Sequence, residues 1–384
     1  MGLAKVEGEN MKKLSRDLLE DIMARLDGST LASAACTCCE IKDIARDQML
    51  WRRLCHSTWP STALEEGRRL MLASGIEGFD KFYADSFPLI LQEKDVSGIS
   101  PEAHVSPSNL VSFIDVYHRK KCISSQVVDG IPDAVDASED NEIMSDLEKW
   151  FNNCLFKLDL FEIKDDEDNV YGNDLHLDDN EFLCNSGDTN AGSGPSSTVV
   201  PVAETTESID YCKELKEGIR LSWILLDKKR GKAVNLSSWK PLLVKKCWPY
   251  EGEYVMHFGC ILPVEESVLP QKLARCLILA RCRVIEKKGH LIWTKICLYF
   301  EDSSGAQLNG AKSLKIMNRA LYYSRSKNHL EFEKMHHCFE RQKKEIMRRE
   351  KCKEKIADCL CLLIQVAIFT ILGYYAMLKE KKNM

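Results

Sequence analysis

The sequence predicts an α+β fold: a small three-helix unit, then an antiparallel β-containing domain, a helical stalk and one C-terminal transmembrane helix. Three observations predict it. Apolar residues recur at three- and four-residue steps in the first sixty residues, as on a helical face. From residue 211 onward, apolar runs and alternating patterns typical of strands replace them. Near the C-terminus, residues 359–378 carry no formal charge.

Length and composition describe a globular chain. Its 384 residues allow two or three compact domains. The composition, 45% hydrophobic and 29% charged residues, excludes a fully disordered protein and a polytopic membrane protein. The net charge of −5 hides an asymmetry: residues 129–188 hold 19 acidic residues against three lysines, a net −16 that leaves +11 on the rest. The overall charge gives no reason to expect a nucleic-acid partner.

The 17 cysteines do not predict disulfides or a metal site. The first ten residues lack the apolar core of a secretory signal, so we expect reduced thiols that serve as small core residues. Cys36, Cys38 and Cys39 form one cluster, and residues 336–338 (His-His-Cys) form another. Neither has the second ligand pair that zinc sites need, so no metal and no cofactor is expected.

Residues 11–60 predict the N-terminal helical unit. A first helix over residues 14–26 carries one apolar face, with Ser15 and Asp17 as candidate caps and Asp27-Gly28 as its end. Ser29 is expected to cap a second helix over residues 30–39, and a third runs over residues 40–54. Trp59-Pro60 closes the unit, which is too small to be stable without a neighbour or a partner.

These residues carry a resemblance. Residues 14–26, Leu-Ser-Arg-Asp-Leu-Leu-Glu-Asp-Ile-Met-Ala-Arg-Leu, resemble the opening of an F-box, and residues 38–55 resemble its closing part. The amino-acid sequences of residues 26–36 and 59–61 are similar to those of a plant F-box subfamily. Its members have a C-terminal β-containing domain and a C-terminal membrane anchor. One departure is Ser15, which stands where F-boxes usually have proline. The alternative interpretation of the same residues is a helical bundle that is not an F-box, in which the apolar stripe only packs against the core.

The resemblance implies a receptor without catalytic residues. An F-box docks on a Skp-type adaptor, which in turn binds a cullin with its RING subunit; the protein substrate is unknown. The residues expected to bind the adaptor are Leu14, Ser15, Leu18, Leu19, Ile22, Leu26, Leu31, Cys38 and Trp51. Ser15 leaves open a second interpretation, in which the chain is a membrane-anchored interaction or regulatory protein that acts without ubiquitin transfer.

Residues 61–184 are interpreted as a helical and acidic middle region. Helical spacing covers residues 65–87, Ser108 is expected to cap a helix over residues 110–120, and residues 123–128 are expected to be extended. A strand is expected where Leu158, Leu160 and Ile163 interleave with charges. Residues 185–207, rich in Gly, Ser, Thr and Pro, are expected to be a disordered linker.

Residues 208–305 predict the antiparallel β-containing domain, with strands over 220–227, 253–262, 274–286 and 291–302 and a hairpin turn at 287–290. Strict alternation on the last strand assigns one face to Ile292, Thr294, Ile296, Leu298 and Phe300, and the other to Trp293, Lys295 and Tyr299. This region also resembles the C-terminal part of the plant subfamily, at Leu-Ser-Trp-Ile (221–224) and at residues 235–241.

No enzyme is expected. The sequence lacks the common nucleophile, phosphate-loop, dinucleotide and zinc-protease motifs. His257 and Cys260, three residues apart on a strand, would lie on opposite faces. The four tryptophans of the region are interpreted as core and edge packing, with a ligand pocket as the alternative: Trp223, Trp239, Trp248 and Trp293.

Residues 356–378 predict a transmembrane helix, represented by Cys359, Leu363, Ile368, Leu372 and Leu378. Twenty uncharged residues span about 30 Å as a helix, and ten of them are Leu, Ile, Val or Phe. Residues 306–355 are interpreted as a basic helical stalk, whose charges also favour anionic head groups. Eight basic residues precede the span in 341–355 and three follow it, which favours a cytosolic N-terminus.

The sequence therefore predicts a single-pass, tail-anchored protein of an undetermined organelle, with a nuclear pool if the anchor is removed. Its expected work is that of the substrate-recognition subunit of a cullin-RING, SCF-type ubiquitin ligase, tethered to a membrane and recruiting its target through the C-terminal region.

Overall fold

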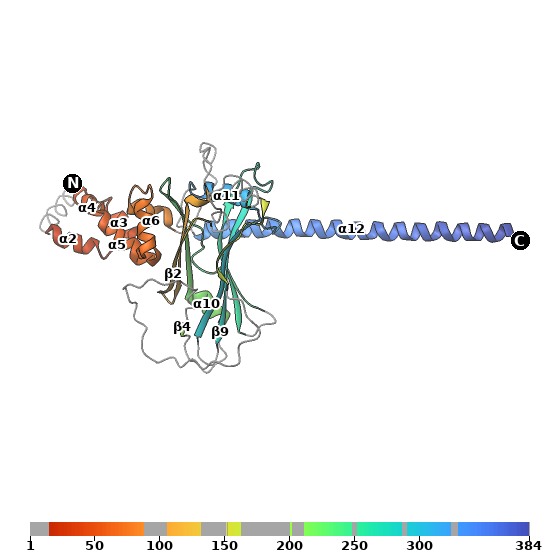
Figure 1. Cartoon of the computed structure of the whole chain (residues 1–384), viewed down its shortest axis with the longest axis horizontal. Coiled ribbons are helices and arrows are strands. Elements are labelled where there is room, and N and C mark those ends of the chain that lie inside the picture. The colour runs from red at the N-terminus through yellow and green to blue at the C-terminus, as the bar shows by residue number, and fades with distance from the viewer. Residues whose placement is uncertain are drawn as a thin grey trace, which may run out of the picture.

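The structure, a computed structural model, describes residues 15–87, 106–131, 151, 153–162, 200–201, 211–247, 252–285, 290–323 and 329–383. Figure 1 shows three parts in a row: N-terminal helices, two sheets, and a long helix that leaves the sheets. The predicted linker, residues 185–207, lies outside the described residues except for the short strand β4 (Val200–Pro201). The hairpin residues 287–289 also lie outside them.

Short helices form the N-terminal part, and three of them have a side-chain cap. They are listed in chain order: α2 (Arg16–Met23), α3 (Gly28–Ala34), α4 (Cys39–Ala45), α5 (Gln48–Thr58), the 3₁₀ helix η1 (Pro60–Ala63), α6 (Glu65–Ala73) and α7 (Phe79–Ser86). Ser15, Asp27 and Asp47 each cap a helix by accepting a backbone N–H. The Asp47 cap explains why the predicted third helix is in fact two, α4 and α5.

The first sheet has the order β2-β1-β5-β6. Its strands are β1 (Leu110–His118), β2 (Lys121–Asp129), β5 (Ile219–Asp227) and β6 (Lys232–Asn235). The helix expected over residues 110–120 is therefore wrong. All of β1 is buried, because Val111 and Phe113 face the N-terminal helices while Ile114 and Val116 face the second sheet. A strand covered on both faces loses the alternation that reveals strands in a sequence.

The second sheet has the order β3-β10-β9-β8-β7, and β4 also pairs with β10. Its strands are β3 (Leu158–Glu162), β7 (Leu243–Lys246), β8 (Glu253–Pro263), β9 (Leu273–Ile285) and β10 (His290–Asp302). The four strands predicted after residue 211 are confirmed as β5, β8, β9 and β10 within a few residues. The predicted strand around Leu158 is confirmed as β3.

The face assignment on β10 is partly wrong. A bulge between Trp293 and Lys295 shifts the register, so that Trp293 joins Ile296 and Leu298 in the core. Ile292 is only partly buried. A bulge inserts one extra residue and exchanges the two faces beyond it, which strict alternation cannot anticipate.

The two sheets enclose the main core, which also takes in α11 (Gly310–Ala320). Leu314 and Met317 of α11 are buried there, so the expected stalk does not begin at residue 306. The last helix, α12 (His329–Asn383), packs on β8 at its start and then leaves the sheets, as Figure 1 shows. Residues 347–373 of α12 are all exposed.

Candidate adaptor-binding site

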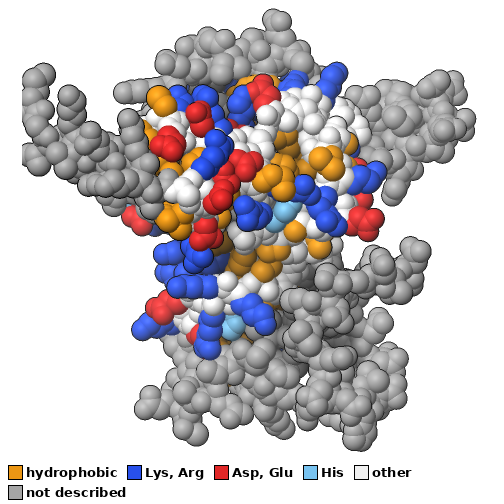
Figure 2. Space-filling model, turned by 90° about the vertical axis from the view of Figure 1, so that its left-hand side faces the viewer, with side chains coloured by type: hydrophobic (Ala, Val, Ile, Leu, Met, Phe, Trp, Pro, Cys, Tyr) orange, Lys and Arg blue, Asp and Glu red, His pale blue; other side chains and the backbone are white. Residues whose placement is uncertain are grey.

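Helix α2 presents an apolar pair at the surface. Leu18 and Ile22 lie one helical turn apart on the same side, and they remain 45% and 41% exposed. Ion pairs border them: Arg16 contacts Glu20 at 2.9 Å, and Arg25 contacts Asp21 at 2.8 Å. Figure 2 views this end of the molecule, where hydrophobic side chains lie among basic and acidic ones. Such an apolar site with a charged border is typical of a protein interface.

Ser15 stands at the entrance to this face. Its side-chain oxygen accepts a hydrogen bond from the Leu18 backbone N–H at 3.3 Å, and its backbone is extended, with φ −64° and ψ 149°. This confirms Ser15 as the cap of α2. The φ value is also one that proline adopts without strain.

We expect Ser15→Pro to strengthen adaptor binding, because the ring adds apolar surface beside Leu18 at a backbone angle that proline favours. The lost cap should cost about 1 kcal/mol of stability. Calorimetric titration with the adaptor measures the affinity, and thermal unfolding measures the stability. Ser15→Ala is the control, since it removes the cap without adding the ring. An affinity no better than that of Ser15→Ala would contradict the expectation.

Three of the expected adaptor residues lie below this surface. Leu19, Leu31 and Trp51 are buried in the core of the helical unit, where the Trp51 indole donates to the Ala45 carbonyl at 2.7 Å. These three buried side chains support the exposed surface of α2 by packing in the core below it. Leu26 is half-buried and packs against the same core, whereas Cys38 is exposed. Leu14 lies outside the described residues.

Sequence reasoning did not single out Met49, which is exposed in the first turn of α5. The available signal was Asp47, whose cap bond to the Met49 backbone N–H at 2.9 Å places this turn at a helix start. Met49 points away from the core, with 55% of its surface exposed, whereas Leu50 and Trp51 of the same turn are buried.

The helical unit is fixed to the first sheet rather than hanging from a linker. Trp59 and Phe82 share a core with Phe113 and Ile224 of the sheet. A buried carboxylate adds a polar link: Asp115 on β1 accepts from the Ser61 backbone N–H at 2.8 Å, the Ser61 hydroxyl at 2.6 Å and the Ser125 hydroxyl at 2.6 Å. Burial raises the pKa of Asp115 to about 6, against the lowering effect of these hydrogen bonds.

This raised pKa predicts a pH dependence. The folded state holds the Asp115 proton more tightly than the unfolded chain does, so this contribution to stability is complete below about pH 4 and is lost as pH rises through about 6. Asp115→Asn should remove it, since an amide keeps the shape and does not ionise. Relative to wild type, the variant should gain about 2 kcal/mol between pH 4.5 and 7, measured by denaturant unfolding in detergent. A difference independent of pH would contradict this.

The sheets hold no arrangement that suggests catalysis among the described residues. Trp223 and Trp293 are core residues, and Trp223 borders a small gap with room for about one water molecule. The rings of Trp239 and Tyr117 are in tilted contact, with their centres 5.1 Å apart, and Trp248 lies outside the described residues. Cys260 is buried opposite Cys276, and burial lowers the pKa of His257. No group of His, Cys, Asp or Glu in the described chain could hold a metal ion.

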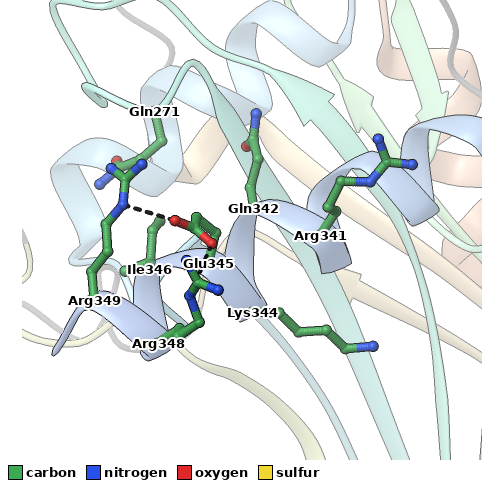
Figure 3. A pocket seen from close by; sticks show the side chains of 8 residues that line it. All are labelled: Gln271, Arg341, Gln342, Lys344, Glu345, Ile346, Arg348 and Arg349. Carbon is green, nitrogen blue, oxygen red and sulfur yellow. Dashed lines mark hydrogen bonds and ion pairs between the residues drawn. The ribbon is translucent and has the colours of Figure 1, made fainter. Parts of the chain in front are cut away.

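Two further surfaces lie on α12. A shallow recess beside Gln271 is lined by seven residues of α12: Arg341, Gln342, Lys344, Glu345, Ile346, Arg348 and Arg349 (Figure 3). Glu345 there pairs with Arg349 at 3.1 Å and with Arg348 at 3.5 Å. Farther along, α12 has a segment long and apolar enough to cross a membrane, and it is the only such helix among the described residues. None of this apolar window is buried inside the described structure; Phe369, for example, is 73% exposed.

Comparisons with known proteins agree with the helical geometry. A family model described as F-box-like matches residues 16–57. Three Arabidopsis thaliana proteins are similar over most of the chain: a probable F-box protein, 25% identical over 94% of this chain and 92% of its own length, and two F-box proteins, 24% identical over 97% and 98%, and 27% identical over 80% and 73%. No solved structure gives a significant match. The chain therefore has an F-box-like domain at its N-terminus and is similar over most of its length to plant F-box proteins.

Proposed function

We propose that this protein is the substrate-recognition subunit of a cullin-RING, SCF-type ubiquitin ligase, tethered to a membrane. F-box proteins generally act as non-catalytic substrate adaptors, and an F-box implies a Skp-type adaptor as partner. The observation that carries the proposal is the apolar pair Leu18 and Ile22, exposed on a helix that matches the family model. The sheets would then recruit the protein substrate.

A membrane anchor is supported by the exposed apolar part of α12. Leu363, Ile368 and Leu372 are each half or more exposed, and apolar side chains occupy every side of the helix there. A soluble protein seldom leaves so much contiguous apolar surface in water. The excess of basic residues before this segment favours an N-terminus in the cytosol, where the adaptor is found.

Ser15 supports one alternative, an interaction protein that regulates its partner without ubiquitin transfer. With serine in place of proline, α2 keeps its cap but offers the adaptor less apolar surface. The two functions differ in a reconstitution with adaptor, cullin, RING subunit and ubiquitin-conjugating enzyme. Our proposal expects adaptor-dependent ubiquitin transfer to lysines of the receptor or of a bound target. Adaptor binding without any transfer would favour the alternative.

A further inference from the structure

The cysteines of α12 differ from those of the cores. Buried thiols serve as small apolar residues in the helical unit and in the sheets, at Cys55, Cys260, Cys276, Cys282 and Cys297. Four free thiols are instead exposed along α12, at Cys338, Cys352, Cys359 and Cys361. Packing does not explain a thiol at an exposed position, so their places along the helix decide what they can do.

Two of these cysteines stand at the start of the apolar segment. Residues 359–378 carry no formal charge, and as a helix they rise about 30 Å, the thickness of the hydrocarbon layer. Cys359 therefore lies where the hydrocarbon begins, and Cys361 lies about 3 Å deeper. Leu360 and Leu362 beside them are 54% and 61% exposed. In a bilayer, both thiols would have lipid as their neighbour.

The other two exposed thiols lie above the bilayer in this geometry. Measured along the helix, Cys352 is about 10 Å before Cys359, and Cys338 is about 32 Å before it. The polar zone of a leaflet is about 5–7 Å thick, so both lie in water. Cys352 nevertheless shares a face with Cys359, because seven residues make about two turns. Cys352 therefore matches Cys359 in exposure and in face, and differs from it in height.

We propose that Cys359 and Cys361 are S-acylated by a long-chain fatty acyl thioester of coenzyme A. The inference rests on the proposed membrane anchor with a cytosolic N-terminus, which places both thiols in the leaflet that faces the acyl donor. The cysteine sulfur attacks the carbonyl carbon of the donor, a new carbon–sulfur bond forms, and the bond to coenzyme A breaks. The cysteine proton goes to the departing coenzyme A thiolate. One thioester replaces another, so the step needs no oxidant or reductant.

Depth decides which thiols can hold a fatty chain. A chain on Cys359 or Cys361 enters hydrocarbon at its point of attachment, and each methylene group that it buries there is favourable. A chain on Cys352 would first have to cross the polar zone and would leave part of its length in water. Because Cys359 and Cys361 are about 200° apart around the helix, two chains would lie on opposite sides of α12.

The test detects thioesters in the full-length protein from membranes of expressing cells. Free thiols are blocked with N-ethylmaleimide, thioesters are cleaved with hydroxylamine, and each newly released thiol is tagged with a maleimide polymer that shifts the protein on a gel. Wild type should show a hydroxylamine-dependent shift, and Cys359→Ser with Cys361→Ser should lose it. Cys338→Ser with Cys352→Ser is the matched control and should shift as wild type does. Equal shifts of the two double variants, or no shift of wild type, would overturn the inference.

Two further measurements separate this inference from the anchor. Leu363→Arg with Ile368→Arg keeps both thiols but removes the anchor, so its shift should disappear; a shift that persists in the released protein would contradict the role of membrane depth. Alkaline carbonate treatment of wild-type membranes tests the anchor itself. Extraction of the protein would overturn the anchor and this inference together, whereas a retained protein without a hydroxylamine-dependent shift would overturn this inference alone.

Discussion

Leu18→Ala combined with Ile22→Ala is expected to reduce adaptor affinity at least thirtyfold. Both side chains are already more than half-covered in the free protein, so an adaptor buries only the remainder, worth about 1 kcal/mol each. Truncation at the centre of an interface adds the cost of a poorly filled contact, which brings the pair to about 2–4 kcal/mol. Titration of the purified variant with the adaptor, compared with wild type, measures the loss.

The matched control is Leu64→Ala with Leu72→Ala. These leucines are also exposed, but they lie outside α2–α5 and outside the residues that match the F-box-like family. The control should bind the adaptor as wild type does, and both double variants should unfold at nearly the wild-type temperature. If the α2 variant and its control bind equally well, Leu18 and Ile22 do not belong to the interface.

Leu363→Arg combined with Ile368→Arg is expected to release the protein from the membrane. Each arginine near the centre of a span costs about 2.5–3.5 kcal/mol on the insertion scale, and each change also removes a favourable apolar side chain. The sum, about 6–8 kcal/mol, exceeds the favourable 3–6 kcal/mol that the ten large apolar residues of the segment supply. Alkaline carbonate extraction of membranes from expressing cells measures the change, and a chain ending at Lys355 should behave in the same way.

Met347→Arg with Leu72→Arg serves as the control, because it adds the same charge at exposed apolar positions outside the span. It should stay in the carbonate-resistant fraction. Wild type that is extracted as readily as the arginine variant would show that residues 359–378 do not anchor the protein.

Patterns that depend on neighbours along the chain were predictable. The strands β8 and β9 stand out in the sequence as long apolar segments, and the N-terminal helices show their apolar steps and caps. Errors arose where a distant partner decides the structure. Residues 110–118 became a strand because helices cover one face and the second sheet covers the other. The bulge at Trp293 depends on its pairing with β9.

Gly28 gives a local example. The sequence predicted that it ends the first helix and that Ser29 caps the second. Instead, Asp27 accepts from the Thr30 backbone N–H at 2.9 Å and Gly28 lies inside α3. A β-carbon on Gly28 would lie 2.3 Å from the Tyr83 ring, so the glycine is needed for close packing against α7. That contact spans 55 residues and leaves no local signal.

For the candidate site, the sequence predicted the helix that carries it, but not which of its residues are exposed. Spacing identified the apolar residues of α2, but it could not separate Leu18, which is exposed, from Leu19 and Trp51, which are buried. That division depends on how α3, α4 and α5 pack, because they decide which side of α2 the core covers. The link from Ser61 to Asp115 was not foreseen, since its partners are 54 residues apart.

The central claim is that this chain binds a Skp-type adaptor through its N-terminal helices. The most direct test is a calorimetric titration of the full-length protein, in detergent, with purified adaptor. We predict one adaptor per chain with a dissociation constant of about 1 µM or tighter, near −8 kcal/mol. Absence of binding at adaptor concentrations of about 100 µM, with the protein folded by circular dichroism, would contradict the account.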